Sequence, residues 1–373
     1  MENDFSKTVQ EKQISENREQ VRIDKKYEKI IAPSSKIFYA SIVLFNILTL
    51  VIAVLYLNSK QTVEDIRIVF EAFDYKLLIL LTVIFLSIIL IKALPIFLKI
   101  FAKTKSKKFG RVLGATITQE YFGCVTVYGN AKNSSAIKYL EKSQVDDVTA
   151  IDVVYGANVL DKLSYILYAI VIMFIGILGF ASNVNVWLIV IASLALALNI
   201  VIVLIVLLFE NHKKGVINIV SKTVKLLYRL KLIKDYEALY NKIIDKLIIN
   251  AKGIKQDGWI TFTEIFAGLL RNFLKGAILY FVIVTLNIAD GNVIFDILFR
   301  CLILDLILKS LPLQSGTLIF EILFIALFRS LFFSGYVFWA LLIYRFFDLF
   351  AYVIAYLITL ICNAIRNKKV IKQ

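Results

Sequence analysis

The chain contains apolar runs long enough to cross a lipid bilayer, and these limit its possible folds more than any other feature. Residues 37–57 carry no charged side chain over 21 positions, which in a helix spans about 30 Å of hydrocarbon at about 1.5 Å per residue. The other long apolar runs cover residues 77–101, 163–182, 186–209, 260–288 and 335–362. The sequence therefore predicts an all-α, polytopic integral membrane protein with six full spans.

Composition argues against several other classes of protein. Hydrophobic residues make up 59% of the 373 positions and the mean hydropathy is +0.77, whereas a soluble domain is about 45–50% apolar. The cysteines Cys124, Cys301 and Cys362 lie far apart, and the single histidine, His212, has no second ligand nearby in sequence. A disulfide scaffold, a zinc site and a Cys/His nucleophile pair are therefore not expected, and neither is a cofactor.

Two further apolar stretches are interrupted by residues that favour turns. Residues 109–140 contain four glycines and then the polar string NAKNSS, whereas residues 293–333 are broken by Pro312, Gln314, Ser315 and Gly316. Each stretch has the pattern of a helix, a polar turn and a second helix, with limbs of about 15–17 residues that are short for an ordinary crossing. We expect two re-entrant hairpins.

The distribution of Lys and Arg predicts the orientation, because short basic loops stay in the cytoplasm. The tail 1–36 has eight basic residues, residues 102–111 have five, residues 210–259 have eleven, and the tail 363–373 has four. The turns 183–185 and 289–292 have none. This alternation places both polar tails in the cytoplasm of a multi-pass cell membrane protein, and one hairpin then enters from each side of the bilayer.

This layout has an internal symmetry. Residues 37–182 give two spans, a hairpin and a span starting inside, and residues 183–362 give the same order starting outside. Such an inverted-topology repeat is common in transporters. Chance similarity between weakly defined segments is the alternative.

Residues 210–259 form the main polar insertion of the second repeat. Apolar residues recur there at helical spacing with lysines between them, which predicts two amphipathic helices on the inner leaflet. The basic residues would attract anionic inner-leaflet lipids, although the positive-inside rule alone also explains them. Nucleic acid is not an expected partner, because the cytoplasmic loops account for the basic residues.

Charged residues inside the predicted spans are candidate site residues, because an ionised group at the bilayer centre costs about 2.5–3.5 kcal/mol on insertion scales. Glu264, Arg271, Asn272 and Lys275 share one face of the run 260–288. This face could line a cationic cavity. Alternatively, Glu264 and Arg271 could form an internal ion pair.

The second half of the chain carries several more such charges. Asp296 with Arg300, and Asp305 with Lys309, are spaced i, i+4 as ion pairs on opposite sides of one helix. Glu321 and Arg329 follow in the second limb of the hairpin, and Arg345 lies in the last span. These residues either line a site for an anionic headgroup or fix the re-entrant fold as structural pairs.

The first half has fewer charges within its apolar segments. Lys92 and Lys99 share a face on either side of Pro95, and Lys99 is expected to reach toward the membrane surface. Glu120 lies in the first hairpin and Lys132 follows its polar turn. Asp161 could be solvated at the cytoplasmic boundary.

The order of segments, with the strings GNAKNSSAIKYL (129–140), VVYGANVLDKL (153–163), LPLQSGTLIFE (311–321) and LLIYRFFD (341–348), resembles the flippase-like family of the transmembrane region of lysylphosphatidylglycerol synthase, the multiple peptide resistance factor. Pro312, Gly316, Glu321 and Arg345 match the family pattern of the second hairpin and last span. The first hairpin departs from it, because Gly129 stands where proline is expected.

The resemblance implies a flippase-like transporter of a phospholipid, with aminoacylated phosphatidylglycerol as one candidate. Glu264, Arg271, Lys275, Arg300, Glu321, Arg329 and Arg345 would line the path of the headgroup. Two alternatives stay open: a membrane-embedded lipid-modifying enzyme, and a membrane partner of a separate lipid aminoacyltransferase. The expectation is a transporter without aminoacyl-transferase chemistry.

The predicted topology can be tested by cysteine labelling. In a chain lacking its three native cysteines, a cysteine at Lys60 or Asp290 should react with an impermeant thiol reagent in intact cells, because both positions are predicted to lie outside. A cysteine at Lys234 should react only after permeabilisation. Labelling of position 234 in intact cells would overturn the orientation.

Overall fold

The computed structural model describes residues 75–105, 108–125, 131–180, 184–209, 212–230, 235–254, 258–285, 294–310, 318–331 and 336–371, together with Ile47 and Val51. Almost all of these residues are helical, and no strand occurs among them. The prediction of an all-α protein is therefore confirmed for the described part of the chain. The predicted first span, residues 37–57, and the tail 1–36 lie almost wholly outside it.

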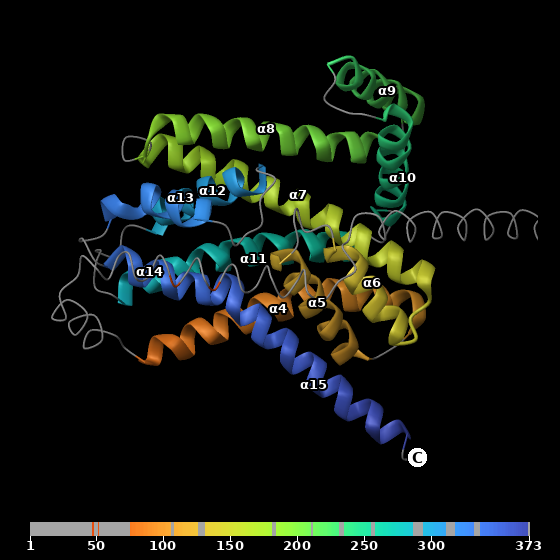
Figure 1. Cartoon of the computed structure of the whole chain (residues 1–373), viewed down its shortest axis with the longest axis horizontal. Coiled ribbons are helices and arrows are strands. Elements are labelled where there is room, and N and C mark those ends of the chain that lie inside the picture. The colour runs from red at the N-terminus through yellow and green to blue at the C-terminus, as the bar shows by residue number, and fades with distance from the viewer. Residues whose placement is uncertain are drawn as a thin grey trace, which may run out of the picture.

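The helices follow one another along the chain as Figure 1 shows. Their bounds are α4 Tyr75–Thr104, α5 Phe109–Val125, α6 Lys132–Lys142, α7 Asp147–Phe180, α8 Val186–Phe209, α9 Lys213–Arg229, α10 Tyr236–Ile254, α11 Gly258–Thr285, α12 Ile294–Ser310, α13 Leu318–Phe328, α14 Tyr336–Arg345 and α15 Ala351–Ile371. A 3-10 turn, Arg329–Leu331, follows α13, and a π-helical turn, Phe346–Phe350, joins α14 to α15. The last helix continues through most of the predicted basic tail 363–373.

Five helical segments are long and apolar enough to cross a membrane. They are Lys76–Thr104, Asp147–Phe180, Val186–Phe209, Gly258–Ile283 and Trp339–Ile365. Each contains most or all of one of the predicted apolar runs, because hydropathy over about 20 residues identifies such helices. The chain is therefore a helical, multi-pass membrane protein.

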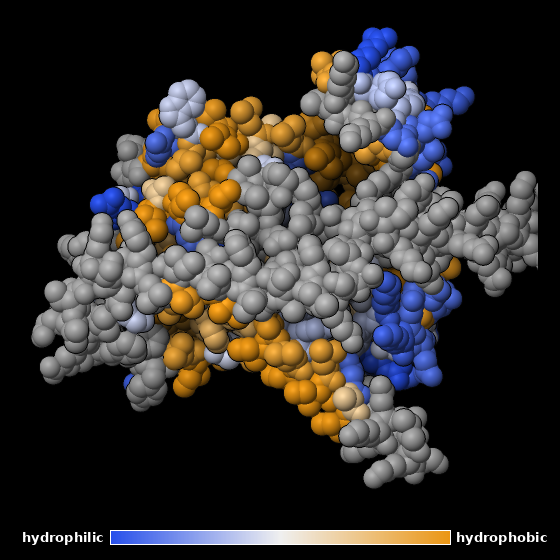
Figure 2. All heavy atoms as spheres, in the orientation of Figure 1, coloured by the Kyte–Doolittle hydropathy of each residue, from blue (hydrophilic) through white to orange (hydrophobic). Residues whose placement is uncertain are grey.

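The surface of the long helices is apolar, as expected for side chains that face lipid. On α8, Leu194, Leu198 and Ile202 are each more than half exposed, and Phe174 and Leu178 on α7 are more exposed still. Figure 2 shows apolar residues over α8 and along α4 and α15, and hydrophilic residues gathered near α9 and α6. Exposed apolar area on this scale would make a soluble protein aggregate, whereas a bilayer covers it.

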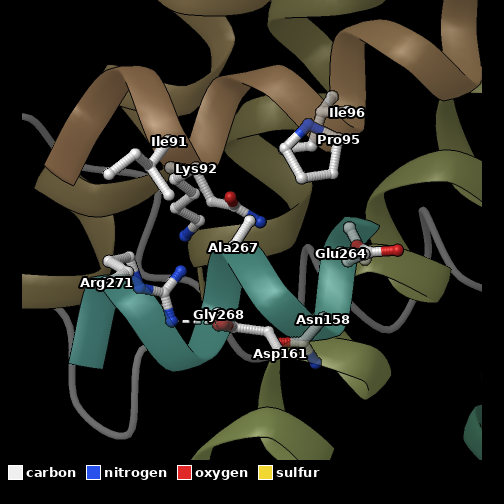
Figure 3. Close-up of a pocket in the computed structure, with 12 residues that line it drawn as sticks. Ile91, Lys92, Pro95, Ile96, Asn158, Asp161, Glu264, Ala267, Gly268 and Arg271 are labelled. Carbon is white, nitrogen blue, oxygen red and sulfur yellow. Dashed lines mark hydrogen bonds and ion pairs between the residues drawn. The ribbon is translucent and has the colours of Figure 1, made fainter. Parts of the chain in front are cut away.

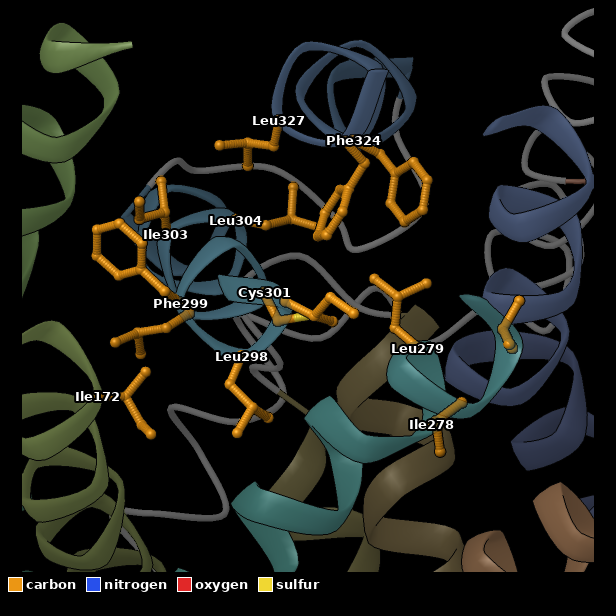
Figure 4. Packing of buried hydrophobic residues seen from close by; sticks show 14 of the residues in the cluster. Ile172, Ile278, Leu279, Leu298, Phe299, Cys301, Ile303, Leu304, Phe324 and Leu327 are labelled. Atoms are coloured by element: carbon orange, nitrogen blue, oxygen red, sulfur yellow. The ribbon is translucent and has the colours of Figure 1, made fainter. Parts of the chain in front are cut away.

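Helix α12 lies at the centre of the main core, against α7, α8, α11 and α13. Eleven of its residues are buried, including Leu298, Phe299 and Ile303 (Figure 4). A helix that is apolar on all sides must be surrounded by other helices or by lipid. The two charged pairs on α12 do not suit a lipid-facing helix, and the structure surrounds this helix with protein.

Helices α9 and α10 confirm the two amphipathic segments predicted within residues 210–259. Val216, Val220 and Val224 from α9 and Leu247 and Ala251 from α10 share a core with Val159 of α7 and with the end of α8. Part of each apolar face is therefore covered by protein, which the sequence did not predict.

Two glycines of α7 provide a matched test of this packing. Gly176 is buried, and a Cβ added there would overlap the ring of Phe299, whereas a Cβ on the exposed Gly179 would meet nothing within 4 Å. Gly176→Ala should lower thermal stability in detergent by about 1–3 kcal/mol through overpacking. Gly179→Ala should be neutral or slightly stabilising. Equal thermal stability of the two variants would contradict the close approach of α7 and α12.

Candidate functional site

A polar pocket lies inside the helical bundle where α4, α5, α7 and α11 meet (Figure 3). Its volume of about 20 Å³ has room for about one water molecule. Pro95 lines it and has no N–H group, so the Ile91 carbonyl beside it lacks its usual helical donor. The lining residues are Ile91, Lys92, Pro95, Ile96, Gln119, Ala157, Asn158, Asp161, Glu264, Ala267, Gly268 and Arg271.

The polar face of α11 is turned into the protein, as the sequence predicts. Glu264, Arg271 and Asn272 are buried, and Lys275 is half-buried. The alternative of an ion pair between Glu264 and Arg271 is wrong. Seven residues of helix separate these side chains by about 10 Å along the axis, and each pairs with another helix instead.

The partner of Glu264 is Lys99 of α4, and their side chains are 5% and 1% exposed. The expectation that Lys99 reaches the membrane surface is therefore wrong. A buried carboxylate on a neighbouring helix holds this lysine inside, because two opposite charges that pair lower the free-energy cost of burying each of them.

Arg271 forms an ion pair with Asp161 of α7, and the two lie against one wall of the pocket (Figure 3). The Asp161 side chain is only 20% exposed, so the reading of this residue as merely solvated is wrong. The Nε atom of Arg271 is buried and has no hydrogen-bond partner among the described residues.

Glu120 of the first hairpin lies between two lysines. It pairs with Lys92 of α4, and Lys132 of α6 approaches its Oε1 atom to 3.6 Å. Figure 3 shows Lys92 and Arg271 extending toward the same end of the pocket, and the two cations interact electrostatically.

These five side chains form what we name the central cluster: Lys92, Glu120, Lys132, Asp161 and Arg271. Three are basic and two are acidic, so the ionised cluster carries one positive charge in excess. Excess charge in an apolar environment is costly unless a counter-charge is supplied. The cluster therefore holds an imbalance of charge inside the helical bundle.

Lys275 adds a further cation one turn beyond Arg271 on α11. It is half-buried and lines a second pocket with Tyr344, Asp348 and Tyr352. Within the part of the chain that the structure describes, no acidic side chain lies within 4.0 Å of its Nζ atom. Lys275 is therefore the cation of this region best placed to accept a new partner.

Arg300 has a different role from the one expected of a headgroup ligand. Its guanidinium donates to both carboxylate oxygens of Asp296, at 2.8 and 3.1 Å. It also donates to the Leu327 carbonyl and to the Ser330 hydroxyl, the latter at 2.9 Å. These contacts join α12 to the end of α13 and use donors that a ligand would need.

Glu321 and Arg345 come together as predicted, and they pair directly. Arg345 Nε and Nη2 lie 3.1 and 2.9 Å from Glu321 Oε1, and the guanidinium lies 3.7 Å from the centre of the Phe320 ring. Asp348 lies 3.7 Å away on the π-helical turn. Both members of the pair are buried, which supports the reading of a structural pair between α13 and α14.

The remaining predicted site residues do not join the central cluster. Arg329 is exposed in the 3-10 turn after α13. Pro312 and Gly316 lie outside the described residues. The Asp305–Lys309 pair forms at 2.6 Å as its spacing predicts, with both side chains about half exposed.

Sequence reasoning noted every charge of the central cluster but placed only Arg271 in the site. The other four residues are brought together by pairing between different helices, and the spacing of residues within one helix does not predict such pairing. Charges of opposite sign within separate apolar segments, such as Lys92 and Glu120, were the available clue.

The described residues contain no group of three or more His, Cys, Asp or Glu side chains that could hold a metal ion. Comparison of the chain with protein-family models, with curated proteins and with solved structures gave no match.

The assignment of Arg345 as structural and Lys275 as available for a ligand can be tested by stability. Arg345→Gln should lower thermal stability in detergent, because losing one partner of a buried pair costs about 3–5 kcal/mol. Lys275→Gln, which breaks no ion pair among described residues, should unfold near the wild-type temperature.

The double variant Glu321→Gln/Arg345→Gln should lose less stability than the two single changes together, because the lost interaction is shared. Additive losses, or a wild-type unfolding temperature for Arg345→Gln, would remove the pair from the structural framework.

Proposed function

We propose that the protein translocates a phospholipid between the leaflets of the cell membrane, with the headgroup passing the central cluster while the acyl chains stay in the bilayer. The observation that supports this most is the central cluster itself, in which three cations from α4, α6 and α11 meet two carboxylates from α5 and α7 inside the bundle. A lipid phosphate matches such a site, because charged hydrogen bonds to phosphate are among the strongest in proteins.

The proposed topology has six spans, two opposed re-entrant hairpins, both termini in the cytoplasm and an inverted repeat. Helix lengths support it: α5 and α6 contain 17 and 11 residues, and α12 and α13 also contain 17 and 11. In both halves a long apolar helix precedes this short pair and another follows it. Repeats of this kind place substrate sites where the two halves meet.

Headgroup chemistry narrows the class of lipid. The cations of the central cluster and Lys275 would hold the phosphate, and the carboxylates Glu120 and Asp161 would accept an amine. Aminoacylated phosphatidylglycerol, which the family resemblance implies, carries both groups. A simple anionic phospholipid would use the cations alone.

In the proposed transport cycle, this structure represents a closed conformation. A pocket with room for about one water molecule excludes a headgroup, so the walls formed by α4, α5, α7 and α11 must separate during transport. Ion pairs between these helices could then exchange partners. A phosphate could replace Asp161 as the partner of Arg271, or Glu120 as the partner of Lys92.

Transport can be measured with purified protein in vesicles that contain phosphatidylglycerol labelled on an acyl chain with a fluorophore. Dithionite bleaches only the labelled lipid of the outer leaflet. Translocation brings labelled lipid from the inner leaflet to the outer one, where dithionite can bleach it. Lys275→Gln should slow this exchange about tenfold or more, because one charged hydrogen bond is worth about 1.5–3 kcal/mol.

The matched control is Lys108→Gln, which removes an exposed lysine just before α5 and should leave the rate unchanged. A wild-type rate for Lys275→Gln would exclude this residue from the path. Recovery of a chemically altered lipid would favour the alternative of a lipid-modifying enzyme. A purified chain that moves no lipid, but does so with a lipid aminoacyltransferase added, would favour the partner role.

A further inference from the structure

The apolar side of helix α9 is wider than the strip that other helices of the protein cover. Val216, Val220 and Val224 face inward and share a core with α10, with the end of α8 and with Val159 of α7. Next to this covered strip lie Ile219 and Leu226, which are 55% and 56% exposed. Leu230, directly after the helix, is 58% exposed and continues the same strip.

The opposite side of α9 is strongly basic. The helix contains five basic residues and no acidic residue. Lys222, Lys225 and Arg229 follow one another on the exposed side, and Lys222 borders the strip of Ile219 and Leu226. Figure 2 shows hydrophilic residues gathered at this end of the molecule, beside the apolar surface of the long helices.

The position of α9 makes a bilayer its natural neighbour. The helix follows the end of α8, a candidate membrane span whose Leu204 and Leu208 are 48% and 47% exposed. Figure 1 shows α9 extending beyond α8 on the outer side of the bundle. Helix α9, with its uncovered strip, thus follows in the chain directly after the exposed apolar surface of α8.

We infer that α9 docks on anionic lipid at the membrane surface, with Ile219, Leu226 and Leu230 at the boundary between headgroups and acyl chains. An amphipathic helix with lysines beside its apolar face binds in this way, through buried apolar area and attraction to anionic headgroups. The charge of α9 matches such lipid and would repel a basic protein partner. This inference is independent of whether the protein transports lipid.

The test uses full-length protein without its native cysteines, in vesicles of phosphatidylcholine with or without phosphatidylglycerol. An environment-sensitive fluorophore is attached at Leu226→Cys or, as the matched control, at Lys225→Cys on the basic side. In vesicles with phosphatidylglycerol, brominated lipid should quench the probe at 226 strongly, and aqueous iodide should quench the probe at 225.

The anionic requirement is tested by omitting phosphatidylglycerol and by the Lys222→Gln/Arg229→Gln variant, each of which should increase iodide quenching at position 226. Equal lipid quenching at 226 in both kinds of vesicle would overturn the assignment of anionic lipid. Equal iodide access at positions 225 and 226 under all conditions would overturn membrane docking and leave the strip as a surface for a protein partner.

Discussion

The cost of placing ionised side chains inside an apolar helical bundle determines how the helices pack. Lys99 of α4 reaches Glu264 of α11. About two turns further along the same face of α11, Arg271 reaches Asp161 of α7. An isolated charge at these depths would be expensive, whereas a paired one is tolerated. The pairs therefore fix the rotation of α11 about its own axis, because turning the helix would separate both partners at once and expose its polar face to lipid.

The two halves of the chain use this constraint differently. In the second half, Arg300 pairs with Asp296 and Arg345 pairs with Glu321, whereas Arg271 of α11 reaches across to Asp161 of the first half. These arginines also join helices, because Arg300 donates from α12 to the Leu327 carbonyl of α13 and Arg345 joins α14 to α13. At the central cluster, Glu120 is shared between two lysines of the first half, and Arg271 from the second half adds a third cation, so the positive charges of the cluster outnumber the negative ones. In an arrangement with shared partners a ligand can replace one of them, whereas Arg300 and Arg345 each already donate two hydrogen bonds to one carboxylate.

Much of the fold could be predicted from the sequence because bilayer thickness sets the length of an apolar helix. The same holds for the i, i+4 pairs on α12, where the helix itself brings Asp305 and Lys309 together. Partners on different helices could not be predicted, because they depend on which faces meet and at what depth. Lys99 shows the difference: its place near a helix end favours the membrane surface, but Glu264 on another helix holds it inside.

The packing of α11 also explains the position of Lys275, which has no ion-pair partner among the described residues. Lys275 lies one turn beyond Arg271, so the packing that buries Arg271 also holds Lys275 within the bundle, yet no described carboxylate lies within 4.0 Å of it. Asp348, which lines the same pocket, lies on the π-helical turn and is already 3.7 Å from Arg345. A π-helical turn widens the helix and re-aims its side chains. The turn therefore places Asp348 near Arg345 and in the same pocket as Lys275, so that one carboxylate lies close to both cations.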